Sequence, residues 1–170
     1  MNIIETERLI LRPLTIEDAE DLYRIYSDPE TMKFMIDNAR SVEVVRSAIG
    51  KHIDTYYNVY GFGLWATVLK ESNSLIGRCG LLSQEIDGVK ELELAALIGS
   101  NYWGQGLAAE AARAIVKLGF EKYGAHRIIA IIFPQNTNSI RLAERIGMKF
   151  QREIDQYRDF GRILLYALDS

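Results

Sequence analysis

The residues of this sequence best suited to chemistry are two glycines in a short stretch, Trp103-Gly104-Gln105-Gly106-Leu107-Ala108. A strand-like run precedes the stretch and a helix-like run follows it. The first amides of a helix have no intrahelical partner and lie at the positive end of its dipole, so such a junction can bind a phosphate or pyrophosphate through backbone N–H groups. The pattern therefore favours an enzyme that binds a phosphorylated cofactor.

Other interpretations of the glycine turn make different demands on the sequence. Gly104 and Gly106 could serve only to turn the chain between a strand and a helix. As part of a dinucleotide-binding fingerprint they would need an acidic residue about 20 positions later, and residues 124–135 contain no Asp or Glu. A phosphate-loop NTPase would need a Gly-Lys-Ser/Thr sequence, which does not follow the glycines. The phosphate site built from backbone amides is thus the leading interpretation.

Composition and charge narrow the class of protein. The 170 residues are 48% hydrophobic and 25% charged, which suits one domain, residues 1–170, with a single core. A net charge of −3 leaves no broad basic surface for nucleic acid. No apolar run approaches the roughly 18 residues of a membrane span, and the first residues do not resemble a secretory signal peptide. We therefore expect a cytoplasmic protein without a nucleic-acid or membrane partner.

Metal and cysteine chemistry are not expected. Cys79 is the only cysteine, and His52 and His126 are the only histidines. One cysteine cannot form an internal disulfide or a zinc cluster, and the two histidines are too far apart in sequence to suggest a metal motif. Cys79 lies in an apolar run with no neighbouring histidine, which is typical of inert packing rather than of a nucleophilic thiolate.

The elements that position the turn are predicted from the apolar periodicity. We expect strands at residues 8–12, 62–69, 75–82, 90–98, 127–133, 149–154 and 163–168, and helices that begin near Thr15, Ser41, Leu107 and Asn136. Asp87-Gly88 is a strong hairpin signal, and the apolar run 127–133 is typical of a buried parallel strand. Together they predict an α+β fold with a mixed, mostly antiparallel sheet of about six to seven strands, one parallel β-α-β crossover and about four flanking helices.

Four motifs follow one another along nearly the whole chain: Glu7-Arg8-Leu9-Ile10-Leu11-Arg12-Pro13, the glycine turn, Asn136-Thr137-Asn138-Ser139, and Glu144-Arg145-Ile146-Gly147-Met148. The ordered set resembles the GNAT superfamily of acyl-CoA-dependent N-acetyltransferases, and within it the branch that includes the ribosomal-protein N-terminal acetyltransferases. The resemblance implies acetyl-CoA as co-substrate and an amine acceptor, either a small molecule or a protein N-terminus. Because family members are often dimers, it also raises a homodimer as a candidate assembly.

The same resemblance implies where acetyl-CoA binds. Its pyrophosphate would lie on the glycine turn, formed by Trp103, Gly104, Gln105, Gly106, Leu107 and Ala108. In the family the fourth strand splays from the fifth, and amides near the end of that fourth strand bind pantetheine and the thioester oxygen. Here those amides belong to Ala96, Leu97 and Ile98, and the CoA arm would also contact Asn136 and Ser139.

Acetyl transfer needs a base, because an alkylamine is mostly protonated at pH 7. The family pattern often carries an acidic residue on the fourth strand, which makes Glu93 the candidate base; the alternative is that Glu93 and Glu91 lie on a solvated sheet face. Many members carry a tyrosine acid where this chain has Ala143, so Ser139 is the candidate that assists the departing thiolate. Asn136 could also be an ordinary helix N-cap.

These assignments predict direct acetyl transfer in a ternary complex. The competing hypothesis is a non-catalytic module that senses acetyl-CoA, which the absence of the tyrosine at Ala143 supports. The acceptor is not selected by the sequence: the aromatic residues Tyr56, Tyr57, Tyr60, Phe62 and Trp65 could line a substrate groove, although such a cluster at a helix-to-strand junction is more often core.

Overall fold

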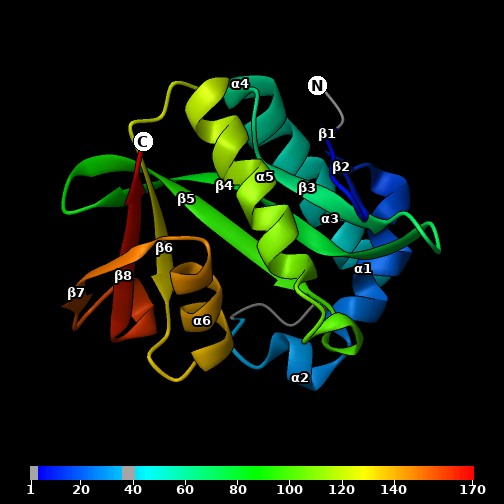
Figure 1. Cartoon of the computed structure of the whole chain (residues 1–170). Helices are drawn as coiled ribbons and strands as arrows, with labels where there is room; N and C mark the ends of the chain where they lie inside the picture. The colour runs from blue at the N-terminus through cyan, green and yellow to red at the C-terminus, as the bar shows by residue number, and fades with distance from the viewer. Residues whose placement is uncertain (1–3, 36–40) are drawn as a thin grey trace.

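The computed structural model describes residues 4–35 and 41–170, and within them eight strands form one mixed sheet (Figure 1). The strand order is β1-β2-β3-β4-β5-β6-β8-β7. The strands are β1 (Ile4–Glu5), β2 (Leu9–Pro13), β3 (Leu64–Leu69), β4 (Ser74–Ile86), β5 (Val89–Ile98), β6 (Arg127–Ile132), β7 (Lys149–Ile154) and β8 (Ile163–Asp169). Neighbouring strands are antiparallel except for β5 and β6, which are parallel. The predicted fold class is confirmed, and the short β1 is a strand that the apolar pattern did not indicate.

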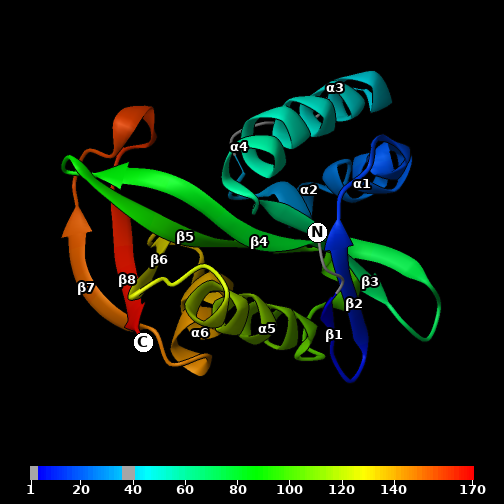
Figure 2. The same cartoon turned by 90° about the horizontal axis from the view of Figure 1, so that it is seen from above.

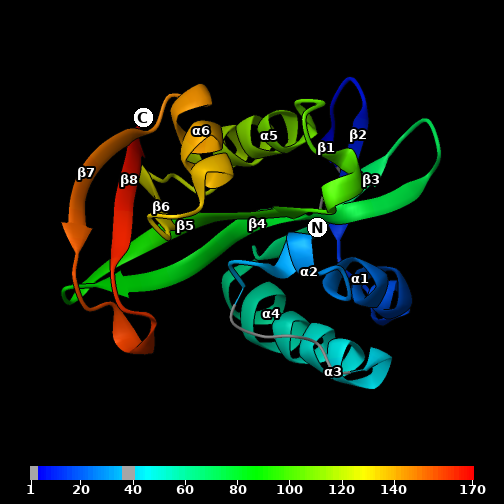
Figure 3. The same cartoon turned by 90° about the horizontal axis from the view of Figure 1, so that it is seen from below.

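Helices cover both faces of the sheet. One face carries α1 (Ala19–Tyr26), α2 (Pro29–Met32), α3 (Val42–His52) and α4 (Asn58–Tyr60), and the other carries α5 (Leu107–Glu121) and α6 (Thr137–Arg145) (Figures 2 and 3). The four longer helices correspond to the four that the sequence predicts, and α2 and α4 add single turns. None of the helices within these described residues is long and apolar enough to cross a membrane.

The first helix is fixed to the sheet by an ion pair. Thr15 precedes a 3-10 turn that continues into α1, and its backbone N–H donates to Asp18 Oδ2 at 2.8 Å. The same carboxylate receives two hydrogen bonds from the Arg12 guanidinium, at 2.8 and 2.7 Å. Asp18 is only 6% exposed, so its carboxylate loses most of its water on folding. The hydrogen bonds from Arg12 and Thr15 replace that water. The capping prediction at Thr15 is thus confirmed, and β2 adds a partner from outside the helix.

The β4–β5 hairpin is longer than the sequence pattern predicts. Its turn is Asp87-Gly88, both with positive φ (51° and 80°), as expected for a tight hairpin. Residues 83–85 are polar and were predicted to lie outside a strand, but they pair with residues 90–92 of β5. Cross-strand pairing keeps this polar segment in the sheet, and the extension places Gln84 beside the strand that carries Glu93.

Close packing of α5 fixes the helix that follows the glycine turn. Ala111 and Ala112 are fully buried, and Ile115 is 1% exposed. A Cβ at Gly119 would lie 2.7 Å from the Ile128 side chain, so this glycine allows the helix to approach the sheet closely. Small residues on the inner face of α5 therefore hold its N-terminus at a defined distance from β5 and β6.

Candidate active site

The glycine turn has the backbone conformation that a phosphate site requires. Gly104 and Gly106 have φ of 76° and 77°, in the left-handed region that side chains disfavour. The first intrahelical bond of α5 is Glu110 N–H to Gly106 O at 3.1 Å, so the amides of residues 107–109 precede any intrahelical acceptor. Open amides at the positive end of a helix dipole can bind an anion, which is what the sequence analysis predicts for this turn.

Trp103 ties the turn back to the strand before it. Its indole Nε1–H donates to the Ile98 carbonyl at 2.7 Å, while 42% of the residue remains exposed. The turn itself begins in a 3-10 segment, Ser100–Tyr102. Ser100 connects this segment to α2, because its N–H donates to Thr31 Oγ1 at 2.8 Å and its hydroxyl donates to Asp28 Oδ2 at 2.5 Å. The turn is therefore held by the end of β5 and by α2.

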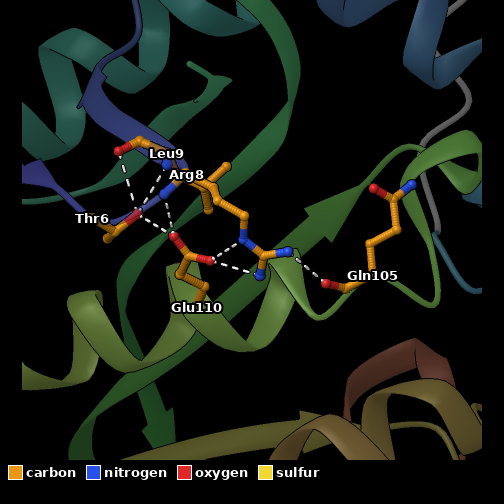
Figure 4. A network of polar contacts seen from close by, with 5 residues as sticks. All are labelled: Thr6, Arg8, Leu9, Gln105 and Glu110. Carbon is orange, nitrogen blue, oxygen red and sulfur yellow. Dashed lines mark hydrogen bonds and ion pairs between the residues drawn. The ribbon is translucent and has the colours of Figure 1, made fainter. Parts of the chain in front are cut away.

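An ion pair between Arg8 and Glu110 holds the other side of the turn (Figure 4). Arg8 donates to Glu110 through its Nε at 2.7 Å and through its backbone N–H at 2.8 Å, and Thr6 Oγ1 donates at 2.6 Å. Arg8 Nη1 also donates to the Gln105 carbonyl at 2.9 Å. Desolvation opposes the charge of Glu110, but these hydrogen bonds outweigh it and hold the pKa of Glu110 below its usual value.

Sequence reasoning missed this network. Arg8 enters the sequence analysis only as part of a motif, and Glu110 is not among its candidate residues. The signal that could have found it is an acidic residue in the first turn of a helix whose N-terminus must stay open, because such a residue needs a partner outside the helix.

A groove of about 500 Å³ runs beside the turn, and basic side chains line it. Its lining includes Gly106 and four basic residues, namely Arg8, Arg113, Lys117 and Arg145. A Cβ at Gly106 would lie 3.7 Å from Arg8 Nη2 and 3.8 Å from Arg145 Nη2, so the two guanidiniums flank this glycine. Although the chain is acidic overall, the groove provides local positive charge for an anion.

The parallel strands β5 and β6 part soon after they meet. They pair only at Leu92 with Ile128 and at Glu93 with Ile129, although β5 continues to Ile98. Beyond Glu93 the predicted pantetheine-binding residues, which are Ala96, Leu97 and Ile98, pair with β4 on one side and with no residue of β6 on the other. The divergence expected from the resemblance is present at the predicted strands.

Glu93 lies where the two strands part, in a largely desolvated setting. Its Oε2 accepts from Gln84 Nε2 at 2.6 Å, and Gln84 Oε1 accepts from Arg158 Nη2 at 2.9 Å. Burial raises the pKa of Glu93, against the opposing effect of the Gln84 hydrogen bond and of nearby positive charge. Glu91, in contrast, pairs with Arg127 at 3.5 Å. Of the two glutamates, Glu93 therefore has the environment of a base.

Asn136 and Ser139 begin the helix that follows β6. Asn136 Oδ1 accepts from the Ser139 backbone N–H at 3.1 Å, so Asn136 acts as the N-cap of α6. Because β5 and β6 are parallel, their carboxyl ends lie at one edge of the sheet, which brings this helix start and the glycine turn to the same edge. Ser139 is partly exposed there.

The remaining reactive candidates are buried. Cys79 is fully buried, and burial raises the pKa of its thiol to about 12. Ala143, at the position where many family members carry a tyrosine, lies on the inner face of α6 and is 3% exposed. Among the described residues no group of three or more His, Cys, Asp or Glu side chains is arranged to hold a metal ion.

The predicted aromatic cluster divides into core and surface. Trp65 is 1% exposed, and the Tyr57 hydroxyl accepts from the Leu14 N–H at 2.8 Å and donates to the Leu64 carbonyl. Tyr56 stacks on His52 at 4.7 Å, while Tyr60 is 47% exposed. Tyr57 and Trp65 are therefore structural, and Tyr56 and Tyr60 remain candidates for acceptor contact.

His52 is fixed as a neutral ring. Its Nε2 accepts from the Leu64 backbone N–H at 2.8 Å. Desolvation, and then the charge of Arg78, lower the pKa of His52 to about 4. His52 therefore positions α3 against β3 and carries no charge near neutral pH.

Comparison with known proteins agrees with this geometry. Residues 8–149 match the model of the acetyltransferase (GNAT) domain, and the chain belongs to this family. It is 32% identical over 160 residues to the uncharacterized N-acetyltransferase p20 of Bacillus licheniformis. The aligned residues cover 90% of this chain and 84% of p20.

Two solved structures have the same fold. A GNAT-family acetyltransferase from Bacillus anthracis is 27% identical with a TM-score of 0.83, over 99% of this chain and 98% of the other. RimL, a ribosomal alpha-N-protein acetyltransferase in complex with coenzyme A, has a TM-score of 0.83 at 16% identity, over 99% of this chain and 98% of RimL. The chain is thus an acetyl-CoA-dependent acyltransferase by family, with the fold of its solved relatives.

Proposed function

We propose that this protein transfers an acetyl group from acetyl-CoA directly to a primary amine, and that the whole chain works as one acyltransferase domain. The observation that carries the proposal is the divergence of β5 and β6 beside the glycine turn. It leaves backbone groups of β5 without a strand partner at the same sheet edge where the α5 amides are open. A long molecule with an anionic end and an amide-rich arm matches this combination.

The phosphate end would be bound by the turn and the basic groove. The amides of residues 105–108 face the pyrophosphate, as the fold of the CoA-bound relative supports. Arg8 and Arg145 flank Gly106 and add positive charge. Arg8 also holds the Gln105 carbonyl, which keeps this acceptor directed away from the incoming anion. Trp103 positions the turn through its bond to Ile98.

The acyl end would lie along β5. Acetyl-CoA supplies the thioester that is attacked, and the backbone amides of Ala96, Leu97 and Ile98 are the candidates that bind pantetheine and the thioester oxygen. Preoriented N–H groups stabilise negative charge on that oxygen, and loss of one such donor typically costs about 3 kcal/mol.

Glu93 would take the proton from the acceptor amine, directly or through water. A raised pKa brings this carboxylate closer to the value that favours general-base catalysis near neutral pH. Gln84, itself held by Arg158, fixes the orientation of the carboxylate. The amine nitrogen forms the new bond to the acyl carbon, and the carbon–sulfur bond breaks. Because Cys79 is buried and protonated, transfer is direct rather than through an acetylated cysteine.

Ser139 would assist the departing thiolate through its hydroxyl or a held water, while Asn136 fixes the helix start on which Ser139 lies. A thiol pKa near 8.5 means that this assistance is worth little at neutral pH. A second candidate function is an acetyl-CoA sensor without catalysis, which is favoured by the buried Ala143 at the family's tyrosine position.

A thiol-release assay tests both functions. Acetyl-CoA is offered with N-terminal peptides, polyamines, amino acids and aminoglycosides, and CoA affinity is measured by calorimetry. Turnover supports the enzyme, and tight CoA binding without turnover supports the sensor. Sedimentation of the same sample tests the homodimer that family membership suggests.

A matched glycine pair tests the phosphate site. Gly106→Ala places a methyl group on the anion-facing side of the turn, while Gly124→Ala introduces the same left-handed strain at an open position far from it. We expect Gly106→Ala alone to weaken CoA binding, by at least about tenfold, because the backbone must approach the pyrophosphate closely. Equal CoA affinity in both variants would place the pyrophosphate elsewhere.

A further inference from the structure

Arg78, in the middle of β4, has no anionic partner among residues 4–35 and 41–170. It is half-buried, and its Nε is shielded from water but donates to no atom of the described residues. Arg12, Arg127 and Arg152 all pair with carboxylates, whereas no carboxylate of the described residues lies within 4 Å of Arg78. Its guanidinium carbon lies 5.6 Å from the centre of the Tyr26 ring. Arginines that are partly withdrawn from water are normally paired, so Arg78 has binding capacity that the described residues do not use.

Arg78 lies on the same sheet face as Glu93. The pairing of β4 and β5 sets Arg78 opposite Leu97 and Leu82 opposite Glu93, and side chains alternate with a period of two. This face is the one covered by α1 and α3, as the contact with Tyr26 shows. Four residues along a strand separate the two positions by about 14 Å between backbones, and both side chains extend from that face.

A second buried polar group without a partner lies near Glu93. Tyr157 is 9% exposed, and its hydroxyl forms no hydrogen bond within the part of the chain that is described. It belongs to the loop between β7 and β8, which lies on the same side of the sheet as α3 and α4 (Figures 2 and 3). Arg158 stacks on its ring at 5.0 Å and reaches Gln84, which bonds Glu93.

The charges on this face act on one another. The positive charges of Arg158 and Arg78 both lower the pKa of Glu93, although burial raises it more strongly. Burial raises the pKa of Tyr157, the charge of Arg158 opposes that rise, and the charge of Glu93 adds to it. The carboxylate of Glu93 therefore lies near the guanidiniums of Arg78 and Arg158 and the hydroxyl of Tyr157. Only Arg158 is connected to Glu93 by hydrogen bonds, through Gln84.

We propose that the acceptor is a small amine that also carries a carboxylate, with the carboxylate bound by Arg78 and the amine held at Glu93. This inference rests on the proposed acetyl transfer and names its substrate class. A guanidinium binds a carboxylate through paired N–H donors, and a dehydrated site strengthens that contact. The Tyr157 hydroxyl is available to the amine end. The separation of the two positions favours acceptors whose amine and carboxylate are several bonds apart, such as ω-amino acids and dipeptides.

The test compares each carboxylate acceptor with its own neutral amide: β-alanine, 4-aminobutyrate, 6-aminohexanoate and glycylglycine. We expect at least one acid to exceed its amide by about 10- to 100-fold in kcat/KM, the effect of a charge-assisted hydrogen bond. In Arg78→Gln this preference is lost through KM, while the affinity for CoA stays unchanged. The readout is the ratio of acid to amide within the variant, because the lost charge also acts on the pKa of Glu93 and changes both rates alike. Arg78→Lys retains part of the preference. Arg24→Gln, an exposed arginine on α1, is the matched control and leaves it intact.

Each outcome decides the proposal. Equal rates for every acid and amide pair in the wild-type protein overturn it, as do neutral peptide N-termini that outperform all acids, while acetyl transfer itself stands. Failure to bind acetyl-CoA instead removes the proposed function. If Arg78→Gln does not fold, the wild-type preference and its decline with added salt are decisive. If no acceptor turns over, calorimetry of the CoA-loaded protein must show tighter binding of an acid than of its amide, and equal binding overturns the inference.

Discussion

Arg8, just before β2, and Glu110, in the first turn of α5, share an ion pair with Nη2 and Oε2 2.7 Å apart, although 102 residues separate them in the chain. The contact joins the edge of the sheet to the helix whose N-terminus forms the glycine turn (Figure 4). It also places Arg8 beside that turn. The Nε and Nη2 of Arg8 contact the Glu110 carboxylate, while its Nη1 donates to the Gln105 carbonyl.

Glu110→Gln is expected to weaken acetyl-CoA binding. The substitution removes the charge that holds Arg8 and leaves the Gln105 carbonyl less firmly fixed, so we expect KM for acetyl-CoA to rise about tenfold with little change in kcat, as for a lost charge-assisted hydrogen bond. Steady-state kinetics with varied acetyl-CoA measure the effect. Glu121→Gln, at an exposed position of the same helix, is the control, and equal effects of the two would contradict a local role.

Glu93→Gln is expected to separate activity from stability. The amide cannot accept the proton, so kcat should fall by about 10²- to 10⁴-fold. The oxygen that Gln84 bonds is retained, and the variant avoids burying a charge. Since the folded-state pKa of Glu93 lies above its unfolded value of 4.5, wild-type stability falls relative to the variant as pH rises from that value through the folded pKa.

Melting temperatures of both proteins across pH 4 to 8 measure that difference. In the wild type, kcat should rise with pH as Glu93 loses its proton. A variant that is fully active, or one whose melting curve tracks the wild type at every pH, would count against Glu93 as the buried base.

Asp28→Asn is expected to alter stability in acid. Asp28 caps α2 and accepts hydrogen bonds from Ser100 and Thr31, which lower its pKa to about 2. Because this pKa is depressed, its stabilising effect is present above pH 3.8 and is lost as pH falls towards 2. The melting temperature of the variant should therefore fall less steeply than that of the wild type in this range, and parallel curves would refute the coupling.

Cys79→Ala is expected to leave the kinetic mechanism unchanged. The thiol is fully buried with a pKa of about 12, so it is not a nucleophile at neutral pH. We expect kcat within about twofold of wild type and a loss of stability of about 1 kcal/mol, the size of a small core truncation. Initial-rate patterns with both substrates varied should intersect in both proteins. Parallel lines, or an inactive variant, would restore an acetyl-cysteine route.

Gly77→Ala is expected to disrupt the sheet where β4 meets β5. A Cβ there would lie 2.1 Å from the Leu97 carbonyl oxygen, which belongs to the backbone and cannot move aside cheaply. We expect a loss of more than about 2 kcal/mol in the free energy of unfolding. Gly50→Ala in α3, where a Cβ meets no atom within 4 Å, should instead stabilise by up to about 1 kcal/mol. Urea unfolding of the two variants measures both.

Local patterns predicted much of the fold. The Asp87-Gly88 hairpin, the helix starts near Thr15 and Ser41 and the parallel strand predicted at residues 127–133 are short-range features whose backbone requirements can be identified in the residues themselves. The pattern failed at residues 83–85, where polarity indicates a loop but pairing with β5 maintains a strand. It also missed β1, because two residues cannot show a period.

The candidate site divides in the same way. The glycine turn and the helix start at Asn136 are local features that the sequence predicts, and the parallel pair brings them to one sheet edge. The contacts of Arg8 with Glu110 and of Gln84 with Glu93 and Arg158 join segments far apart in the chain. No periodicity encodes such pairs, so only the packed structure shows them. The roles assigned to Glu93 and Ser139 remain predictions.

The parting of β5 and β6 also bears on aggregation. Unpaired strand edges at the rim of a sheet are templates on which other chains can add. Here the unpaired stretch of β5 after Glu93 lies inside the sheet, with β4 paired on one side and β6 diverging from it on the other. A thin, flexible molecule can approach such an inner edge, whereas a foreign strand with its own side chains on both faces is excluded by the flanking half-sheets. The unpaired backbone groups of β5 can therefore remain open to a ligand without serving as a template for the addition of strands from other chains.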